Sequence, residues 1–350
     1  MSLATYFSLL ACAPLALGAL TYRGVDWSSL LVEEAAGIEY TGLDGQVQPL
    51  ETILAANGVN SVRQRLWVDP AGGDYGLEYN LELARRAEAA GLSVYLTLHF
   101  SDTWADPSHQ DIPAAWPEGI DDLSWMLYNY TLDVANAFQE AGVQPAMVSV
   151  GNEIRAGLLW PTGSTDSFDN VARLLNSASS GIRDSALDPQ PSIMVHLDNG
   201  WDWDTQKWWY EGVLGAGSFA AEAFDVMGVS FYPFYNSGAS FSALETSLAN
   251  MASTWGKDIV VAELDWPTSC PNPSEAFPGD MQGIPFSPEG QTEFIERVGA
   301  IVGGVSGGVG LYYWEPAWVD NQALGSSCES NTLFEWPGKA LSSIAAFKNL

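Results

Sequence analysis

Two glutamates stand at the ends of apolar runs of the sequence, and their setting favours acid–base chemistry. Glu153 ends the run Met147–Glu153, and Glu263 lies near the end of the run Asp258–Trp266. Paired carboxylates suit acetal hydrolysis, because one can protonate the leaving oxygen while the other attacks the carbon or activates water. A lone glutamate would more often be a salt-bridged structural residue. Two glutamates at matched run ends favour a catalytic pair.

Eight apolar runs of strand length recur along the chain, separated by segments such as 77–90 and 122–141 whose apolar residues lie three and four apart, as in helices. The runs are Tyr22–Ser28, Val59–Trp67, Ser93–Ser101, Met147–Glu153, Ser192–Asn199, Asp225–Pro233, Asp258–Trp266 and Gly308–Pro316. Eight such units predict a single (β/α)8 TIM barrel over residues 19–350, with an elongated substrate cleft at the carboxyl ends of the strands. A doubly wound open sheet is the alternative, but it usually has fewer strands, and no GxGxxG turn follows the first run.

Strand alternation indicates which way the two glutamates face. Successive side chains of a strand point to opposite faces. Glu153 therefore shares a face with Ser149 and Gly151, and Glu263 shares a face with Asp265. We expect these faces to line the barrel interior, so that the two glutamates meet across one cleft.

Composition restricts the class of ligand. The 350 residues include 13 basic and 43 acidic side chains, giving a formal charge of −30, which would repel nucleic acid and anionic membrane surfaces. A neutral ligand, or an acidic medium that protonates many carboxylates, is compatible with that charge. The chain also holds 15 Trp, 13 Tyr and 14 Phe, and such an excess of aromatic rings suits flat apolar ligands such as sugar rings.

The first residues predict an exported protein. Segment 1–18 has no charged side chain and is too short to span a bilayer, which is typical of a secretory signal peptide; a buried amino-terminal helix is the alternative. Removal of the signal takes Cys12 with it and leaves Cys270 and Cys328, an even pair that predicts one disulfide. The sequon at Asn129 predicts N-glycosylation.

Several motifs together resemble glycoside hydrolase family 53, the arabinogalactan endo-β-1,4-galactosidases, in their fungal form. VSVGNE and VVAELDWP alone indicate only the wider clan of retaining glycosidases with an Asn-Glu dyad, whereas LHFSDTWADP and RLWVDP point to this family. The resemblance extends from about Thr21 to the carboxyl terminus. The motifs that carry it are Val62–Trp67, Leu98–Pro107, Val148–Glu153, Val229–Phe234, Val260–Pro267 and Leu311–Trp318.

The resemblance implies a role for each residue around the two glutamates. Glu153 would be the general acid/base and Glu263 the nucleophile that forms a galactosyl-enzyme. Asn152 would bind the 2-hydroxyl of the sugar under attack, Arg63 would keep Glu263 ionised, and Tyr232 would hold the other oxygen of the nucleophile.

Two further assignments stay open. Arg65 shares the strand face of Arg63, and we prefer Arg63 as the partner of Glu263. His99 is either a sugar ligand or a packed histidine that orients one of the glutamates. Further residues at run ends are expected to bind substrate, with Trp314 as the floor for the sugar at the cleavage point: Asp102, Trp104, Asn199, Trp201, Trp266, Trp314 and Trp318.

The resemblance implies a secreted, endo-acting enzyme that cleaves β-1,4-galactosidic bonds of type I (arabino)galactan side chains of pectin with retention. Another retaining β-1,4-glycanase of the clan, such as a mannanase or cellulase, is the alternative within enzymes, and a non-catalytic polysaccharide-binding barrel is the alternative outside them. Bacterial members carry calcium in the loop after strand seven, where this chain has Cys270. We therefore expect no metal, no cofactor and a monomer whose partner is the polysaccharide.

Overall fold

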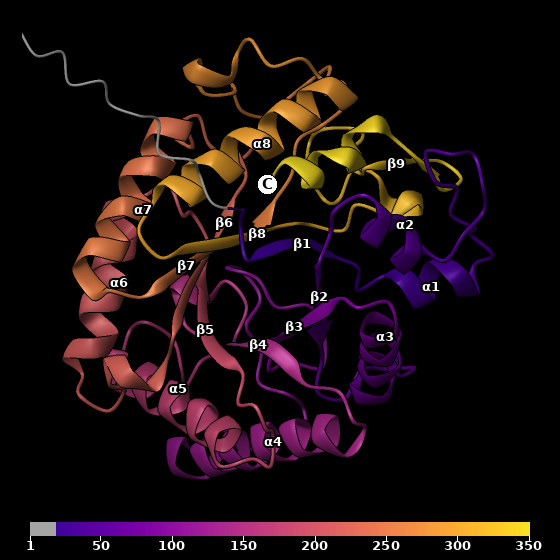
Figure 1. The fold of residues 1–350 in the computed structure, drawn as a ribbon. Coiled ribbons are helices and arrows are strands. Elements are labelled where there is room, and N and C mark those ends of the chain that lie inside the picture. The colour runs from indigo at the N-terminus through magenta and orange to yellow at the C-terminus, as the bar shows by residue number, and fades with distance from the viewer. Residues whose placement is uncertain (1–18) are drawn as a thin grey trace, which may run out of the picture.

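The chain folds as a closed barrel of eight parallel strands, seen in a computed structural model that describes residues 19–350 (Figure 1). The strands follow one another around the barrel in chain order, and β1 closes it by pairing with both β2 and β8. They are β1 (Tyr22–Asp26), β2 (Ser61–Leu66), β3 (Ser93–Leu98), β4 (Pro145–Val150), β5 (Ser192–Leu197), β6 (Val226–Phe231), β7 (Asp258–Leu264) and β8 (Gly308–Tyr313). The predicted TIM barrel is confirmed.

Each strand lies within its expected run, apart from β4, which begins two residues earlier at Pro145. The runs extend beyond the strands at their carboxyl ends, because the polar and aromatic residues there belong to the loops that carry the site.

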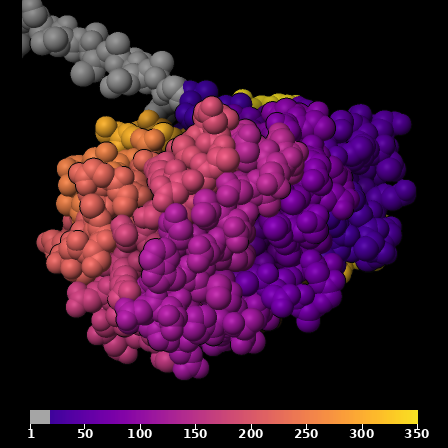
Figure 2. All heavy atoms as spheres, turned by 90° about the horizontal axis from the view of Figure 1, so that it is seen from below, coloured from indigo at the N-terminus to yellow at the C-terminus, as the bar shows by residue number. Residues whose placement is uncertain are grey.

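Helices surround the barrel (Figure 1). They are α1 (Leu30–Ala35), α2 (Leu50–Ala56), α3 (Leu77–Ala89), α4 (Ile120–Glu140), α5 (Phe168–Arg183), α6 (Trp203–Gly215), α7 (Phe241–Trp255) and α8 (Pro288–Gly304). Seen from the side on which α4 lies in Figure 1, most of the surface is formed by residues coloured indigo to pink, with orange and yellow residues at one edge (Figure 2). After β8 the chain forms a short hairpin, β9 (Phe334–Glu335) and β10 (Lys339–Ala340), and a final 3-10 helix, η5 (Ser342–Asn349), which packs on α8.

The barrel interior is apolar at one end and polar at the other. Seven buried side chains fill the apolar end as a cluster separate from the core between strands and helices: Tyr95, Met147, Met194, Val226, Val260, Ala262 and Tyr312. Val148 and Val150 lie in the outer core, as strand alternation predicts. Towards the carboxyl ends of the strands the inward residues become polar, with Ser149 bonded to Thr97 across β3 and β4. The polar end is where a site can form.

A disulfide joins Cys270, in the loop after β7, to Cys328, in the loop after β8. The covalent bond joins the two long loops that border the carboxyl end of the barrel. The disulfide also packs against Phe234. The expected signal peptide and Cys12 lie outside the described residues. Within residues 19–350 no helix is long and apolar enough to cross a membrane.

Candidate active site

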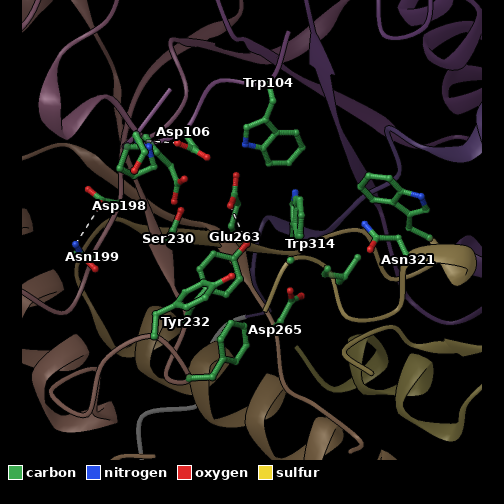
Figure 3. A pocket seen from close by; sticks show the side chains of 18 residues that line it. Trp104, Asp106, Asp198, Asn199, Ser230, Tyr232, Glu263, Asp265, Trp314 and Asn321 are labelled. Carbon is green, nitrogen blue, oxygen red and sulfur yellow. Dashed lines mark hydrogen bonds between the residues drawn. The ribbon is translucent and has the colours of Figure 1, made fainter. Parts of the chain in front are cut away.

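Glu153 and Glu263 both line a cleft of about 540 Å³ at the carboxyl end of the barrel (Figure 3). Glu263 lies on β7, and Glu153 follows β4 in a tight turn in which it adopts a left-handed conformation with φ of 50°. A non-glycine residue at positive φ is strained and is found mostly where a function requires it. Both carboxyls are largely buried, with 9 % of Glu153 and 5 % of Glu263 exposed.

Two donors hold the carboxylate of Glu263. Arg63 Nη2 donates to Oε1 over 2.7 Å, and the Tyr232 hydroxyl donates to Oε2 over 2.8 Å. Burial raises the pKa of Glu263, while the Arg63 cation and the Tyr232 hydrogen bond act in the opposite direction by stabilising the charged form. Both oxygens are thus oriented, and the ionised form that a nucleophile needs is favoured by its direct contacts.

Arg63 is the centre of a buried ionic network. Its side chain is 1 % exposed and also pairs with Asp26, and its Nη2 lies 2.6 Å from Asn152 Oδ1. The carboxylates of Glu263 and Asp26 raise the pKa of the guanidinium against the opposing effect of burial, so Arg63 stays charged. Arg65 pairs instead with Glu315, so the structure places Arg63, the preferred residue, against Glu263.

Glu153 lies in a more negative setting than Glu263. Burial raises its pKa well above the usual range, and the negative charges of Glu263 and Asp198 raise it further. Asp198 is itself held by Arg155, whose Nε lies 2.8 Å from Oδ1. The pKa values of both carboxyls are thus raised by burial, but that of Glu153 is raised further, because Glu263 has Arg63 and Tyr232 to stabilise its charged form. Two carboxyls whose environments separate their pKa values suit an acid paired with a nucleophile.

Asn152 lies beneath the cleft in a fixed orientation. Its Nδ2 donates to the carbonyl of Ala105 over 2.9 Å, and its Oδ1 accepts from Arg63. His196 Nδ1 lies 3.1 Å from the same Oδ1, and its Nε2 lies 3.0 Å from Ser230 Oγ. Because an amide oxygen only accepts, His196 must carry its proton on Nδ1 and accept from Ser230. This network connects the Asn-Glu turn to β2, to β5 and, through His196, to β6.

Aromatic rings form much of the cleft. Trp104 and Trp314 meet edge to face with ring centroids 5.5 Å apart, and Trp314 keeps 8 % of its surface exposed. The guanidinium of Arg65 lies over Trp104 and over Trp318, at 5.0 and 5.3 Å from the ring centroids. These contacts hold the rings at fixed angles, which suits stacking on the apolar faces of sugars.

The structure places Trp104, Asn199, Trp314 and Trp318 in the cleft lining but gives a different position to Trp266. Trp266 is 1 % exposed, stacks on Phe294 of α8 with centroids 5.0 Å apart, and donates from Nε1 to the carbonyl of Pro285. The expectation that it contacts sugar is therefore wrong. Strand alternation gives the reason, since Trp266 follows Asp265 and so points outward, away from the barrel interior.

Two other expected ligands have structural contacts. Asp102 accepts from the backbone N–H groups of Asp69 and Ala114, at 3.1 and 2.8 Å, and so joins two loops. Trp201 is half-buried and packs against the core. Neither belongs to the set of residues that lines the cleft.

His99 supports a loop and does not orient a glutamate. Its Nδ1 accepts from the backbone N–H of Ala105 over 3.0 Å and lies 3.3 Å from Trp67 Nε1. Burial, with the nearby cations Arg63 and Arg65, lowers the pKa of His99 well below its usual value, so the ring is neutral. Within residues 19–350 His99 has no hydrogen bond to either glutamate and its Nε2 has no hydrogen-bond partner, so its alternative role as a sugar ligand stays a prediction.

Several lining residues were not among the expected ligands: Asp106, Ser230, Tyr235, Asp265 and Asn321. Asp265 shares the face of Glu263 and could have been chosen on strand alternation alone. Asn321 lies in the loop after β8, where no sequence pattern marks it. Within the described part of the chain, no group of three or more His, Cys, Asp or Glu side chains is arranged to hold a metal ion.

A closed (β/α)8 barrel with two electrostatically distinct glutamates in an aromatic cleft defines the class of glycoside hydrolases. Residues 22–347 match the model of Glycosyl hydrolase family 53, and the chain belongs to that family.

Relatives and solved structures agree with this assignment. An arabinogalactan endo-beta-1,4-galactanase of Thermothelomyces thermophilus is 64% identical over 332 residues, covering 95% of this chain and all of the relative. One of Aspergillus niger is 56% identical, covering 99% of each chain. A structure described as one of two fungal beta-1,4-galactanases superposes with a TM-score of 0.94 at 64% identity, covering 95% of this chain and 100% of that one. The GH53 catalytic domain of Ignisphaera aggregans gives a TM-score of 0.84 at 29% identity, covering 96% and 97%.

Proposed function

We propose that this glycoside hydrolase is an endo-acting β-1,4-galactanase that cleaves (arabino)galactan side chains of pectin with retention of configuration. The observation that carries the mechanism is the contrast between Glu263, held by Arg63 and Tyr232, and Glu153, whose pKa is raised by burial and by neighbouring negative charge. The names of the similar proteins supply the substrate.

In the first step the Glu263 carboxylate attacks the anomeric carbon while Glu153 gives its proton to the leaving oxygen. The product is a covalent galactosyl-enzyme, with the aglycone part of the chain released. Once Glu263 is esterified its negative charge is gone, and one cause of the raised pKa of Glu153 goes with it. Glu153, now a carboxylate, removes a proton from water as the water attacks the anomeric carbon, the bond to Glu263 breaks, and Glu263 leaves as a carboxylate. Two inversions give net retention.

The neighbours of the pair make each step possible. Tyr232 and Arg63 orient the attacking oxygens, so little rearrangement is needed at the moment of attack. Asn152 holds the backbone turn of Glu153 in place through Ala105. We assign it contact with the 2-hydroxyl of the sugar, and stacking on the sugar to Trp104, Trp314 and Trp318.

The experiment that tests this function compares linear β-1,4-galactan with β-1,4-mannan and cellulose. We expect release of galacto-oligosaccharides from galactan only, with the β-anomer appearing first by proton NMR before mutarotation. Glu153→Gln and Glu263→Gln serve as matched inactive controls. Cleavage of mannan or cellulose in preference to galactan would support the alternative glycanase, and an α-anomer as first product would contradict retention.

We also propose that the protein is secreted as a monomer after removal of residues 1–18. The basis is the uncharged apolar amino-terminal segment, the Cys270–Cys328 disulfide, and the exposed position of Asn129 on α4. Amino-terminal sequencing of the protein from culture medium, with peptide N-glycosidase treatment, tests it. A mature protein that still begins at residue 1 would contradict the signal peptide, and no mass shift would contradict glycosylation.

A further inference from the structure

A third carboxyl in the cleft, that of Asp265, has no role in the mechanism above. It lies at the end of β7, two residues beyond Glu263 on the same face, and it lines the cleft although only 1 % of the residue is exposed (Figure 3). Within residues 19–350 its Oδ1 has no hydrogen-bond partner. A buried polar atom without a partner destabilises the folded protein, and native structures keep such atoms mostly where a function requires them.

Within the part of the chain that the structure describes, no cation pairs with the carboxyl of Asp265. The two buried arginines nearby are engaged elsewhere, Arg63 with Asp26 and Glu263, and Arg65 with Glu315. Burial and the negative charge of Glu263 raise the pKa of Asp265 well above its usual range. The group can therefore carry a proton in the free enzyme, and in that form it can both donate and accept a hydrogen bond, as a sugar hydroxyl does.

The position of Asp265 identifies the side of the scissile bond that it faces. The acidic neighbours that act on Glu153 are Glu263 and Asp198, whereas those acting on Asp265 are Glu263, Glu315 and Asp26. Figure 3 likewise shows Asp198 on one side of Glu263 and Asp265 on the other, below Trp314. Because the general acid must face the leaving group, the opposite side holds the sugar that becomes attached to Glu263 and the units that precede it.

We propose that Asp265 is a substrate-binding residue whose carboxyl hydrogen-bonds a hydroxyl of the galactosyl units on the glycone side of the cleavage point. This inference rests on the proposed galactanase function. The sugar hydroxyl supplies the partner that Oδ1 lacks, while Trp314 packs against the ring. Asn321, whose side chain lines the same side of the cleft, adds a second polar group there. A site built to hydrogen-bond a hydroxyl discriminates strongly against ligands that lack it in the right place.

The test measures kcat/KM on linear β-1,4-galactan together with the melting temperature, for the wild type, Asp265→Asn and Asp265→Ala. We expect Asp265→Ala to lose about 2- to 12-fold in kcat/KM, the range for a hydrogen bond between neutral groups, and Asp265→Asn to lose less because an amide still donates and accepts. The melting temperature of both variants should be equal to or above that of the wild type, since the unpartnered carboxyl is removed. A residue with only a structural role would show the reverse, a lower melting temperature.

Asp258→Asn is the matched control, because Asp258 lies at the other end of the same strand and is exposed. We expect its kcat/KM to equal that of the wild type. Unchanged kcat/KM in Asp265→Ala, or a loss of activity that follows a lower melting temperature, would overturn the inference while leaving the galactanase function intact. A wild type that does not cleave galactan would instead overturn the proposed function on which the inference rests.

Discussion

Arg63 and Glu263 form a buried ion pair, with Nη2 2.7 Å from Oε1, that links β2 to β7 across the barrel interior. The same guanidinium contacts Asp26 on β1 and Asn152 after β4. One side chain thus joins the nucleophile to the turn that carries the general acid. Arg63 is therefore one direct link between the two glutamates, beside the contacts of Tyr232 with Glu263 and of His196 with Asn152.

Replacement of Arg63 by Lys should lower kcat/KM by about 100-fold or more, because an ammonium cannot reproduce the planar fork that reaches three acceptors. It should also raise the pKa of Glu263, since Arg63 is the main group that lowers it. The acid limb of the kcat/KM profile, which reports ionisation of the nucleophile, should then move to higher pH. An acid limb at the wild-type position would contradict the role of Arg63. Arg86→Lys, which changes a cation on α3 that pairs with Glu34 and Glu51 and does not line the cleft, is the control for loss of a guanidinium.

Removal of the Tyr232 hydroxyl isolates the second donor to Glu263. Tyr232→Phe should lower kcat by about 10- to 100-fold, because a hydrogen bond to a charged group is lost while the ring stays in place. The melting temperature should stay within a few degrees of the wild type. Tyr235→Phe is the matched control, since its ring lines the cleft but its hydroxyl does not bond Glu263. An equal loss of kcat in Tyr232→Phe and Tyr235→Phe would contradict the role of the Tyr232 hydroxyl as a donor to Glu263.

The basic limb of the pH profile should depend on Asp198. Its negative charge raises the pKa of Glu153, so Asp198→Asn should lower that pKa and let Glu153 ionise at lower pH. Because the first step needs protonated Glu153, kcat/KM should begin to fall at lower pH than in the wild type. Asp204→Asn, an exposed change on α6, should leave the limb in place. A basic limb that moves to higher pH in Asp198→Asn would refute this electrostatic account.

Glu33 should make the protein less stable as pH rises. Its carboxyl is fully buried on α1, accepts from the backbone N–H of Val319 over 3.1 Å, and has a pKa raised to about 8 by burial and by Asp320. Because the folded pKa exceeds the unfolded one, the folded state binds the proton more tightly. The stabilisation is complete below about pH 4.5 and is lost as pH rises towards 8.

Glu33→Gln should therefore melt at about 2 °C or more above the wild type at pH 8, with a smaller difference at pH 4.5. Differential scanning calorimetry at the two pH values measures this. Glu34→Gln, a half-buried neighbour on α1 paired with Arg86, should not show the same pH dependence. If the melting temperature of Glu33→Gln exceeded that of the wild type by the same amount at both pH values, stability would not depend on protonation of Glu33, contrary to the prediction.

The barrel and the glutamate pair could be predicted from sequence because both depend on local patterns. Eight apolar runs correspond to the eight strands, and period-two alternation correctly separates Met147, in the barrel interior, from Val148 and Val150, which face the helices. Glu263 and Asp265 do share the cleft side, but the rule is interrupted on β7: Val260 and Ala262 face the barrel interior, and the pairing with β6 shifts register between Val229 and Ser230.

Which residues at the strand ends and in the loops line the cleft could not be predicted from strand position alone. Trp266 and Asp102 both stand just beyond a strand: the outward direction of Trp266 follows from alternation with Asp265, whereas at Asp102 the chain has already turned and alternation no longer determines where the side chain points. Trp266 points outward to α8, and Asp102 accepts hydrogen bonds from two loops. Asn321 reaches the cleft through the loop after β8, whose path depends on contacts with Glu33 on α1. Such contacts join residues far apart in sequence, and no local pattern encodes them.

Glu263 is assigned as the nucleophile and Glu153 as the general acid/base. Azide rescue tests this assignment most directly. Glu263→Ala and Glu153→Ala are each given an activated aryl β-galactobioside with and without sodium azide, and the configuration of any glycosyl azide is determined by NMR. We predict an α-azide from Glu263→Ala, because azide replaces the nucleophile in one inversion. We predict a β-azide from Glu153→Ala, because azide then attacks the covalent intermediate. A β-azide from Glu263→Ala, or an α-azide from Glu153→Ala, would contradict the assignment of nucleophile and acid.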